Sequence, residues 1–179
     1  STLALSSGGS DDLTITAGTG AVTLTGAVTL NDNDLTIASS QSSVITGGIS
    51  GSTGALDITD SGTTDVNGAL AMSGAGTITL DGATLGADVT TVGGAINFSG
   101  AVTADQGSAT AVGTGAGAGD VTFGSTLALT SGGNDDLSIT AGTGAVTLTG
   151  AVTLNDNDLT IASSQNSVIT AGISGSTGA

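Results

Sequence analysis

Residues 21–30 have the sequence Ala-Val-Thr-Leu-Thr-Gly-Ala-Val-Thr-Leu, in which two pairs of apolar residues flank a Thr-Gly-Ala step. Within each pair the apolar residues are two positions apart. Because side chains of a β-strand alternate between its two faces, each pair gives a strand one apolar face and one polar face. The glycine between the pairs suits a corner, since it adopts left-handed backbone conformations without steric cost. These residues therefore predict two short strands joined by a tight corner.

Similar pairs recur along residues 1–124, separated by Gly, Asn, Asp and Ser. They are Leu3/Leu5, Leu13/Ile15, Val22/Leu24, Val28/Leu30, Leu35/Ile37, Leu56/Ile58, Leu70/Met72, Ile78/Leu80, Ile96/Phe98 and Val121/Phe123. This alternation has the period of a strand, and no segment has the period of a helix. The pattern predicts an all-β fold made of many short strands.

Two architectures use such strands: a parallel β-helix (β-solenoid), whose coils stack as parallel sheets, and tandem antiparallel β-sandwich repeats. A sandwich usually fills the space of about 10 Å between its sheets with bulky aromatic side chains. This chain has 2 Phe, no Trp and no Tyr. We therefore expect a parallel β-helix with Gly, Asn and Asp at its corners, and the sandwich array is the alternative.

The chain contains an internal duplication. Residues 1–55 match residues 125–179 without a gap, with five differences: Ser6/Thr130, Ser10/Asn134, Thr14/Ser138, Ser42/Asn166 and Gly47/Ala171. All five exchange small or polar residues, and every Leu, Ile and Val is kept. We expect residues 1–124 to form one solenoid unit of about six coils and residues 125–179 to begin the next, as part of a longer array.

The composition excludes several classes of function. The chain has no Lys, Arg, His or Cys, and its 15 acidic residues are all Asp, so the formal net charge is -15. Without basic side chains to pair with phosphate, nucleic acid is not an expected partner. Without His, Cys, Lys, Tyr or Glu, only Asp, Ser and Thr could do chemistry, so we expect that the chain is not an enzyme. No apolar run approaches the ~18 residues of a membrane span.

One tight acidic cluster is a candidate for catalysis. Asp57, Asp60 and Asp65 are close in sequence, and paired carboxylates hydrolyse polysaccharides in many glycosidases. The chain has no cationic side chain to bind an acidic sugar and no aromatic platform for a neutral one. We therefore expect these residues to form a solvated surface.

Residues 21–30 and the segment Asp34-Leu35-Thr36-Ile37 look like repeats of giant bacterial surface proteins. Over essentially its whole length the chain resembles the filamentous-haemagglutinin-like adhesins. Proteins of that group are secreted, very long, right-handed parallel β-helices that project from the cell and mediate attachment or form fibres. The absence of Lys and Arg departs from the usual pattern of the group, so binding of carbohydrate or heparin is not carried over.

This resemblance implies a structural segment of a bacterial cell-surface fibre or giant adhesin, located outside the cell. The implied partners are further copies of the repeat in the same chain, other rods in a filament or bundle, and a host or neighbouring-cell surface. The composition is compatible with such exposure, because a chain without Lys and Arg has no trypsin-type cleavage sites.

Acidic residues at the expected corners are candidate calcium ligands. Stacked coils place like charges about 4.8 Å apart, which attracts cations, and Ca²⁺ prefers oxygen ligands. The candidates are Asp11, Asp12, Asp32 and Asp34 and their copies Asp135, Asp136, Asp156 and Asp158. The alternative interpretation is that these are hydrated corner residues, since Asn and Asp tolerate turn geometry. Neither interpretation requires a cofactor.

A further pattern is the Thr-x-Thr triplet, which places two hydroxyl side chains on the outer face of a strand. It occurs at Thr14-Ile15-Thr16, Thr23-Leu24-Thr25, Thr77-Ile78-Thr79 and Thr147-Leu148-Thr149. Stacked in a solenoid, such triplets would form a flat array like that of some ice-binding β-solenoids. Threonine is also simply well suited to an exposed strand. The alternative to a structural rod is therefore a calcium-dependent or ice- or surface-binding module.

Overall fold

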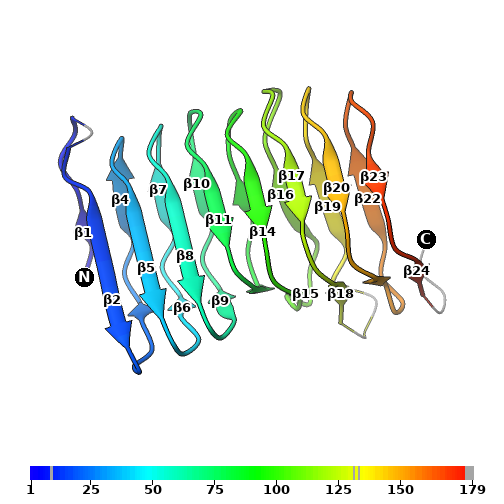
Figure 1. The fold of residues 1–179 in the computed structure, drawn as a ribbon, viewed down its shortest axis with the longest axis horizontal. Coiled ribbons are helices and arrows are strands. Elements are labelled where there is room, and N and C mark those ends of the chain that lie inside the picture. The colour runs from blue at the N-terminus through cyan, green and yellow to red at the C-terminus, as the bar shows by residue number, and fades with distance from the viewer. Residues whose placement is uncertain (9, 131, 133, 176–179) are drawn as a thin grey trace.

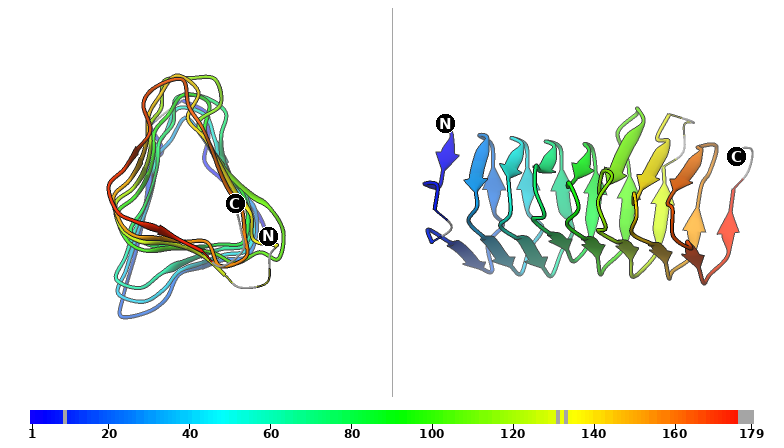
Figure 2. Two further views of the ribbon diagram at one scale, coloured as in Figure 1. Left: turned by 90° about the vertical axis from the view of Figure 1, so that its right-hand side faces the viewer. Right: turned by 90° about the horizontal axis from the view of Figure 1, so that it is seen from above.

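The structure is a computed structural model and describes residues 1–8, 10–130, 132 and 134–175. The last four residues of the second copy, 176–179, lie outside the described residues. The chain winds through eight coils of a parallel β-helix, each with three strands, and contains no helix among the described residues (Figure 1). Coil 1 consists of β1 to β3, coil 2 of β4 to β6, and so on to coil 8. Viewed along the rod, the coils superimpose as a triangle (Figure 2).

Each side of the triangle is one eight-stranded parallel sheet. Sheet A contains β1 (Leu3–Ala4), β4 (Val28–Asn31), β7 (Ile49–Gly51), β10 (Leu70–Met72), β13 (Val89–Thr90), β16 (Thr110–Gly113), β19 (Leu137–Thr140) and β22 (Leu159–Ala162). Sheet B contains β2 (Leu13–Gly18), β5 (Leu35–Ser39), β8 (Leu56–Asp60), β11 (Ile78–Leu80), β14 (Ile96–Phe98), β17 (Val121–Phe123), β20 (Val146–Leu148) and β23 (Val168–Ile169). Sheet C contains β3 (Thr23–Leu24), β6 (Val44–Ile45), β9 (Thr64–Val66), β12 (Ala83–Leu85), β15 (Val102–Ala104), β18 (Leu127–Leu129), β21 (Val152–Thr153) and β24 (Ile173–Ser174).

The core consists of ladders of inward side chains that continue from coil to coil. One ladder of sheet B contains Leu35, Leu56, Ile78, Ile96, Val121 and Val146, all fully buried and paired in register. The two aromatic residues, Phe98 and Phe123, are neighbours in the next ladder of that sheet and stack with ring centroids 4.7 Å apart. Because all pairings among the described strands are parallel, the fold is the expected β-helix and not the sandwich array.

All ten apolar pairs lie on or overlap strands, whereas seven further strands of residues 1–124 were not predicted: β6, β7, β9, β12, β13, β15 and β16. In five of these strands an inward position holds a small or hydroxyl residue, such as the buried Thr64 of β9 and Ala104 of β15, and β6 and β13 have only two residues each. A small residue fits because the other two sheets also fill the narrow interior. Coil 5, for example, combines Ala104 with Phe98.

The two sequence copies are paired identically but lie on different sheets. Leu3 pairs with Val28 in sheet A, whereas the corresponding pair Leu127 and Val152 lies in sheet C. In general β1, β2 and β3 lie in sheets A, B and C, while their copies β18, β19 and β20 lie in C, A and B. The 124-residue unit therefore contains 17 strands, or five and two-thirds coils, instead of a whole number near six.

Candidate functional site

The corner between β4 and β5 is held by two asparagines. Asn31 has a φ of 55°, a left-handed conformation that Asn adopts more readily than most residues. The Asn33 side chain is fully buried, and its Nδ2 donates to the carbonyls of Ser6 at 2.6 Å and Leu30 at 2.8 Å. Its Oδ1 accepts the N–H of Asp11 at 2.9 Å. Asn33 thus joins the corner of coil 2 to the loop of coil 1.

Two of the candidate calcium ligands meet at this corner. The N–H of Asp34 donates to Oδ1 of Asp12 at 3.0 Å, and Oδ1 of Asp34 accepts the N–H of Ala55 in coil 3 at 2.7 Å. Asp32 accepts the hydroxyl of Thr53 at 3.2 Å. The first four candidates are all exposed and lie together at the corner between sheets A and B. The carboxylates of three of them accept hydrogen bonds from the next coil, whereas that of Asp11 accepts the hydroxyl of Ser6 in its own coil.

The second copy repeats this arrangement at the corner between sheets C and A. The N–H of Asp158 donates to Oδ1 of Asp136 at 2.8 Å, and the N–H of Asp135 donates to Oδ1 of Asn157 at 2.8 Å. Asp156 and Asp158 are exposed, and Asp136 is half-buried. The corner hydrogen bonds between stacked coils are therefore present in both copies.

Asp135 differs from its copy Asp11 because a further coil lies beneath it. The Asp135 side chain is buried, and Oδ1 accepts the backbone N–H groups of Gln106 and Gly107, while Oδ2 accepts the hydroxyl of Thr130. Burial alone would raise the pKa of Asp135, but these hydrogen bonds to its carboxylate outweigh burial and lower the pKa below its usual value. Asp135 is therefore an ionised anchor for the loop that joins β15 to β16.

Sequence reasoning missed two aspartates that act in the same way as Asp12. Oδ1 of Asp88 accepts the N–H of Ala111 and Oδ1 of Asp120 accepts the N–H of Ala145, both at 2.8 Å. Each acceptor directly precedes a strand, and each donor lies at the stacked position of the next coil. We call these residues the strand-start aspartates: Asp12, Asp34, Asp88, Asp120 and Asp136. The signal in the sequence is an Asp directly before the first apolar residue of a strand.

A metal site is not completed by these residues. Among the described residues, no group of three or more acidic side chains lies close enough to hold a metal ion. The stacked corners present carboxylates in pairs such as Asp12 and Asp34. Calcium binding at the eight candidates therefore stays a prediction.

The cluster of Asp57, Asp60 and Asp65 is divided between two faces. Asp57 points outward from β8, whereas Asp60 ends the same strand on the inward side and is 4% exposed. Oδ2 of Asp60 accepts the N–H of Ser43 at 3.0 Å and the hydroxyl of Thr64 at 3.2 Å. The expectation of a solvated surface is therefore wrong for Asp60, which is buried, and Asp57 and Asp60 lie on opposite faces of β8.

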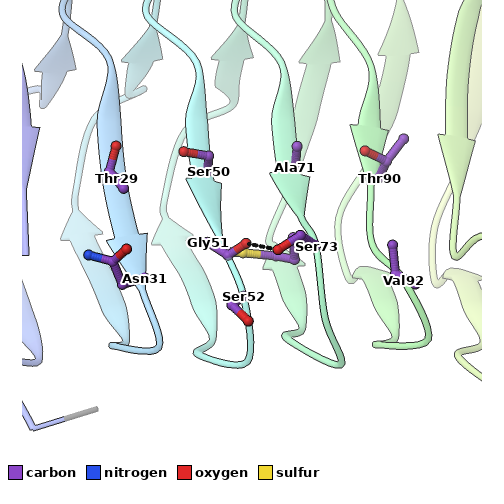
Figure 3. Close-up of a pocket in the computed structure, with 10 residues that line it drawn as sticks. Thr29, Asn31, Ser50, Gly51, Ser52, Ala71, Ser73, Thr90 and Val92 are labelled. Carbon is purple, nitrogen blue, oxygen red and sulfur yellow. Dashed lines mark hydrogen bonds between the residues drawn. The ribbon is translucent and has the colours of Figure 1, made fainter. Parts of the chain in front are cut away.

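The outer face of sheet A contains a shallow hollow of about 470 Å³ (Figure 3). Ser50, Gly51 and Ala71 provide its floor in coils 3 and 4, between larger side chains of coils 2 and 5 that include Val92. The hydroxyl of Ser73 donates to the carbonyl of Gly51 at 3.1 Å. No charged residue lines the hollow, and its polar side-chain groups are hydroxyls and the amide of Asn31.

The threonine triplets do not form an unbroken array. In sheet B the outer column contains, from coil 1 to coil 7, Thr14, Thr36, Asp57, Thr79, Asn97, Thr122 and Thr147. In sheet C, Thr23 is followed by Val44. The outer column of sheet B therefore presents threonine hydroxyls over only parts of its length.

Comparisons with protein-family models, curated proteins and solved structures find no significant match to this chain. Among the described residues, no helix has the length and apolarity needed to span a membrane.

Proposed function

We propose that this chain is a structural segment of a secreted bacterial cell-surface fibre or giant adhesin. In this role it is a stiff, acidic and protease-resistant rod that provides reach for attachment, and it is not an enzyme. The observation that carries the proposal is the continuity of the three parallel sheets through all eight coils. They also continue across the join between the two sequence copies, where β17 pairs with β20.

Stiffness follows from this continuity. Each coil is bound to the next by backbone hydrogen bonds on all three sides and by ladders of buried Leu, Ile and Val side chains. In such quasi-one-dimensional folds each repeat contacts only its neighbours, so length can be added without changing the core. A fold that grows in one direction supports a role in which length itself is the function.

The surface supports a location outside the cell. A net charge of -15 without any cationic side chain keeps rods apart in low salt, and the absence of Cys leaves no thiol to oxidise. Where a corner is short and tight, it also limits the extended segments that a protease needs. Residues 31–34, for example, are held by the buried Asn33.

Immunogold labelling of intact cells tests this proposal, with antibodies raised against residues 1–179. We expect gold particles beyond the outer boundary of the cell, on fibres whose length decreases when the repeat region is shortened in the gene. Labelling that requires permeabilised cells would overturn the proposal.

The alternative is a calcium-dependent or ice- or surface-binding module. The stacking of Asp12 and Asp34 places two carboxylates at one corner of the rod, which supports a calcium-dependent module. The interruption of the threonine column by Asp57 and Asn97 gives less support to an ice-binding face. Thermal hysteresis measurements separate an ice-binding module from a structural fibre, since only an ice-binding module lowers the freezing point below the melting point.

A further inference from the structure

Identical sequence lies on different sides of this rod. Thr29 is on the outer face of sheet A, and its copy Thr153 is on the outer face of sheet C. Ser50 of sheet A and its copy Ser174 of sheet C show the same change. Thr29 and Ser50 line the hollow of sheet A, so the copies of these two lining residues lie on a different face one unit later.

The asparagine corner is nevertheless built in the same way in the two copies. Asn31 and its copy Asn155 have φ values of 55° and 44°. The side chain of Asn33 donates to the carbonyl of Leu30 at 2.8 Å, and its copy Asn157 donates to that of Leu154 at 3.0 Å. The corner network thus forms equally well between sheets A and B and between sheets C and A. This corner therefore does not require a particular side of the triangle.

We infer that each 124-residue unit turns its surface by one third of a turn about the rod axis relative to the preceding unit. A chain of such units presents the same face in the same direction again only after three units, which contain 17 coils. This inference rests on the proposed function in one respect, since it requires the units to follow one another in a longer array.

The consequence concerns the surface that other rods meet. The acidic corner points in a new direction in each unit, first between sheets A and B and then between sheets C and A. Along a chain of units the same surface therefore appears on each of the three sides in turn. The partner that we expect on each side is a second copy of this chain. We expect such rods to pack as bundles with neighbours all round, and not as single-layer ribbons. A flat ligand such as an ice plane would meet a matching face only in every third unit.

Engineered disulfides test the geometry in residues 1–179, because the native chain has no Cys. Thr103 pairs with Ala128 in sheet C, across the join between the two copies. Stacked residues about 4.8 Å apart lie within the Cα separation that a disulfide bridges. The double variant Thr103→Cys/Ala128→Cys should therefore form an intramolecular disulfide on mild oxidation.

Two matched variants complete the experiment. If the unit were a whole number of coils, Ala128 would follow its copy Ala4 onto sheet A and stack on Gly113, since Ala4 and Gly113 occupy the same column. We expect Gly113→Cys/Ala128→Cys to remain reduced. Thr84→Cys/Thr103→Cys, which pair within one copy, shows that the folded chain supports the reaction.

Disulfide formation is measured by the mobility of the oxidised chain in a denaturing gel and by its mass. Formation in the Thr103/Ala128 variant to the extent seen in the Thr84/Thr103 variant supports the inference. Formation in the Gly113/Ala128 variant instead, or in the Thr84/Thr103 variant alone, would overturn it. Neither result depends on where the protein is located. The disulfide experiment can therefore overturn the one-third rotation between units without overturning the surface-fibre proposal, and immunogold labelling can do the reverse.

Discussion

The backbone N–H of Asp34 donates a hydrogen bond of 3.0 Å to Oδ1 of Asp12, which occupies the stacked position one coil below. Their copies Asp158 and Asp136 form the same bond at 2.8 Å on another corner of the triangle. A carboxylate at this position accepts the N–H of the residue that stacks on it in the next coil, which here directly precedes β5. The strand-start aspartates therefore begin the hydrogen-bond ladders, and part of the acidic character of the chain is structural.

Replacing a strand-start aspartate should separate its hydrogen bond from its charge. Asp136→Ala removes the acceptor of the Asp158 N–H, and we expect a loss of about 1 kcal/mol in the free energy of unfolding. Asp136→Asn keeps an oxygen at Oδ1 and should lose clearly less. Urea denaturation of both variants measures the difference. Equal destabilisation by Ala and Asn would show that the charge, and not the acceptor, matters.

Asp135 should make the stability depend on pH. Its pKa is lower in the folded chain than in the unfolded chain, so its ionised form stabilises the fold. This stabilisation is complete above the unfolded pKa of about 4 and is lost as the pH falls through the lower folded value. We expect the difference in unfolding free energy between the native chain and Asp135→Asn to be largest at neutral pH and to decrease toward pH 2. Asp11→Asn, at the exposed copy of this position, is the control. A difference that is constant with pH would contradict the role assigned to Asp135.

The duplication provides a matched test of how much one covering coil stabilises the core. Ile49 in coil 3 is 1% exposed, whereas its copy Ile173 in coil 8 is 49% exposed, in nearly identical sequence. Ile49→Ala should cost about 2 to 5 kcal/mol, because it leaves a cavity among buried side chains. Ile173→Ala should cost much less. Equal losses of unfolding free energy in urea denaturation would show that the side chain of Ile173 is buried in solution.

Calcium should promote lateral association of the rods. Like-charge repulsion opposes contact between chains of net charge -15, and Ca²⁺ neutralises and bridges exposed carboxylates such as those of Asp12 and Asp34. We expect light scattering to rise in millimolar Ca²⁺ and to fall again when a chelator is added. NaCl of equal ionic strength is the control for screening. Scattering that does not respond to Ca²⁺ would count against calcium-bridged bundles.

Much of the architecture follows from local pattern. Apolar pairs such as Ile96/Phe98 predicted strands because alternation shows directly in the sequence, and the shortage of aromatic residues favoured a narrow parallel β-helix over a sandwich. The pattern failed at strands such as β9 and β15, where the inward Thr64 and Ala104 do not stand out from exposed residues. Burial at these positions depends on what the other two sheets contribute to the same coil.

The candidate site divides in the same way. The eight acidic residues were expected at corners, and they lie there, since Asn and Asp in short polar runs mark turns locally. The burial of Asp135 was not predictable, because its partners Gln106 and Gly107 belong to the coil below and are far away in sequence. Likewise, the duplication is visible in the sequence, but its turn about the axis is not. That turn is the sum of every corner and strand between Leu3 and Leu127, and only the stacked structure adds these lengths together into five and two-thirds coils.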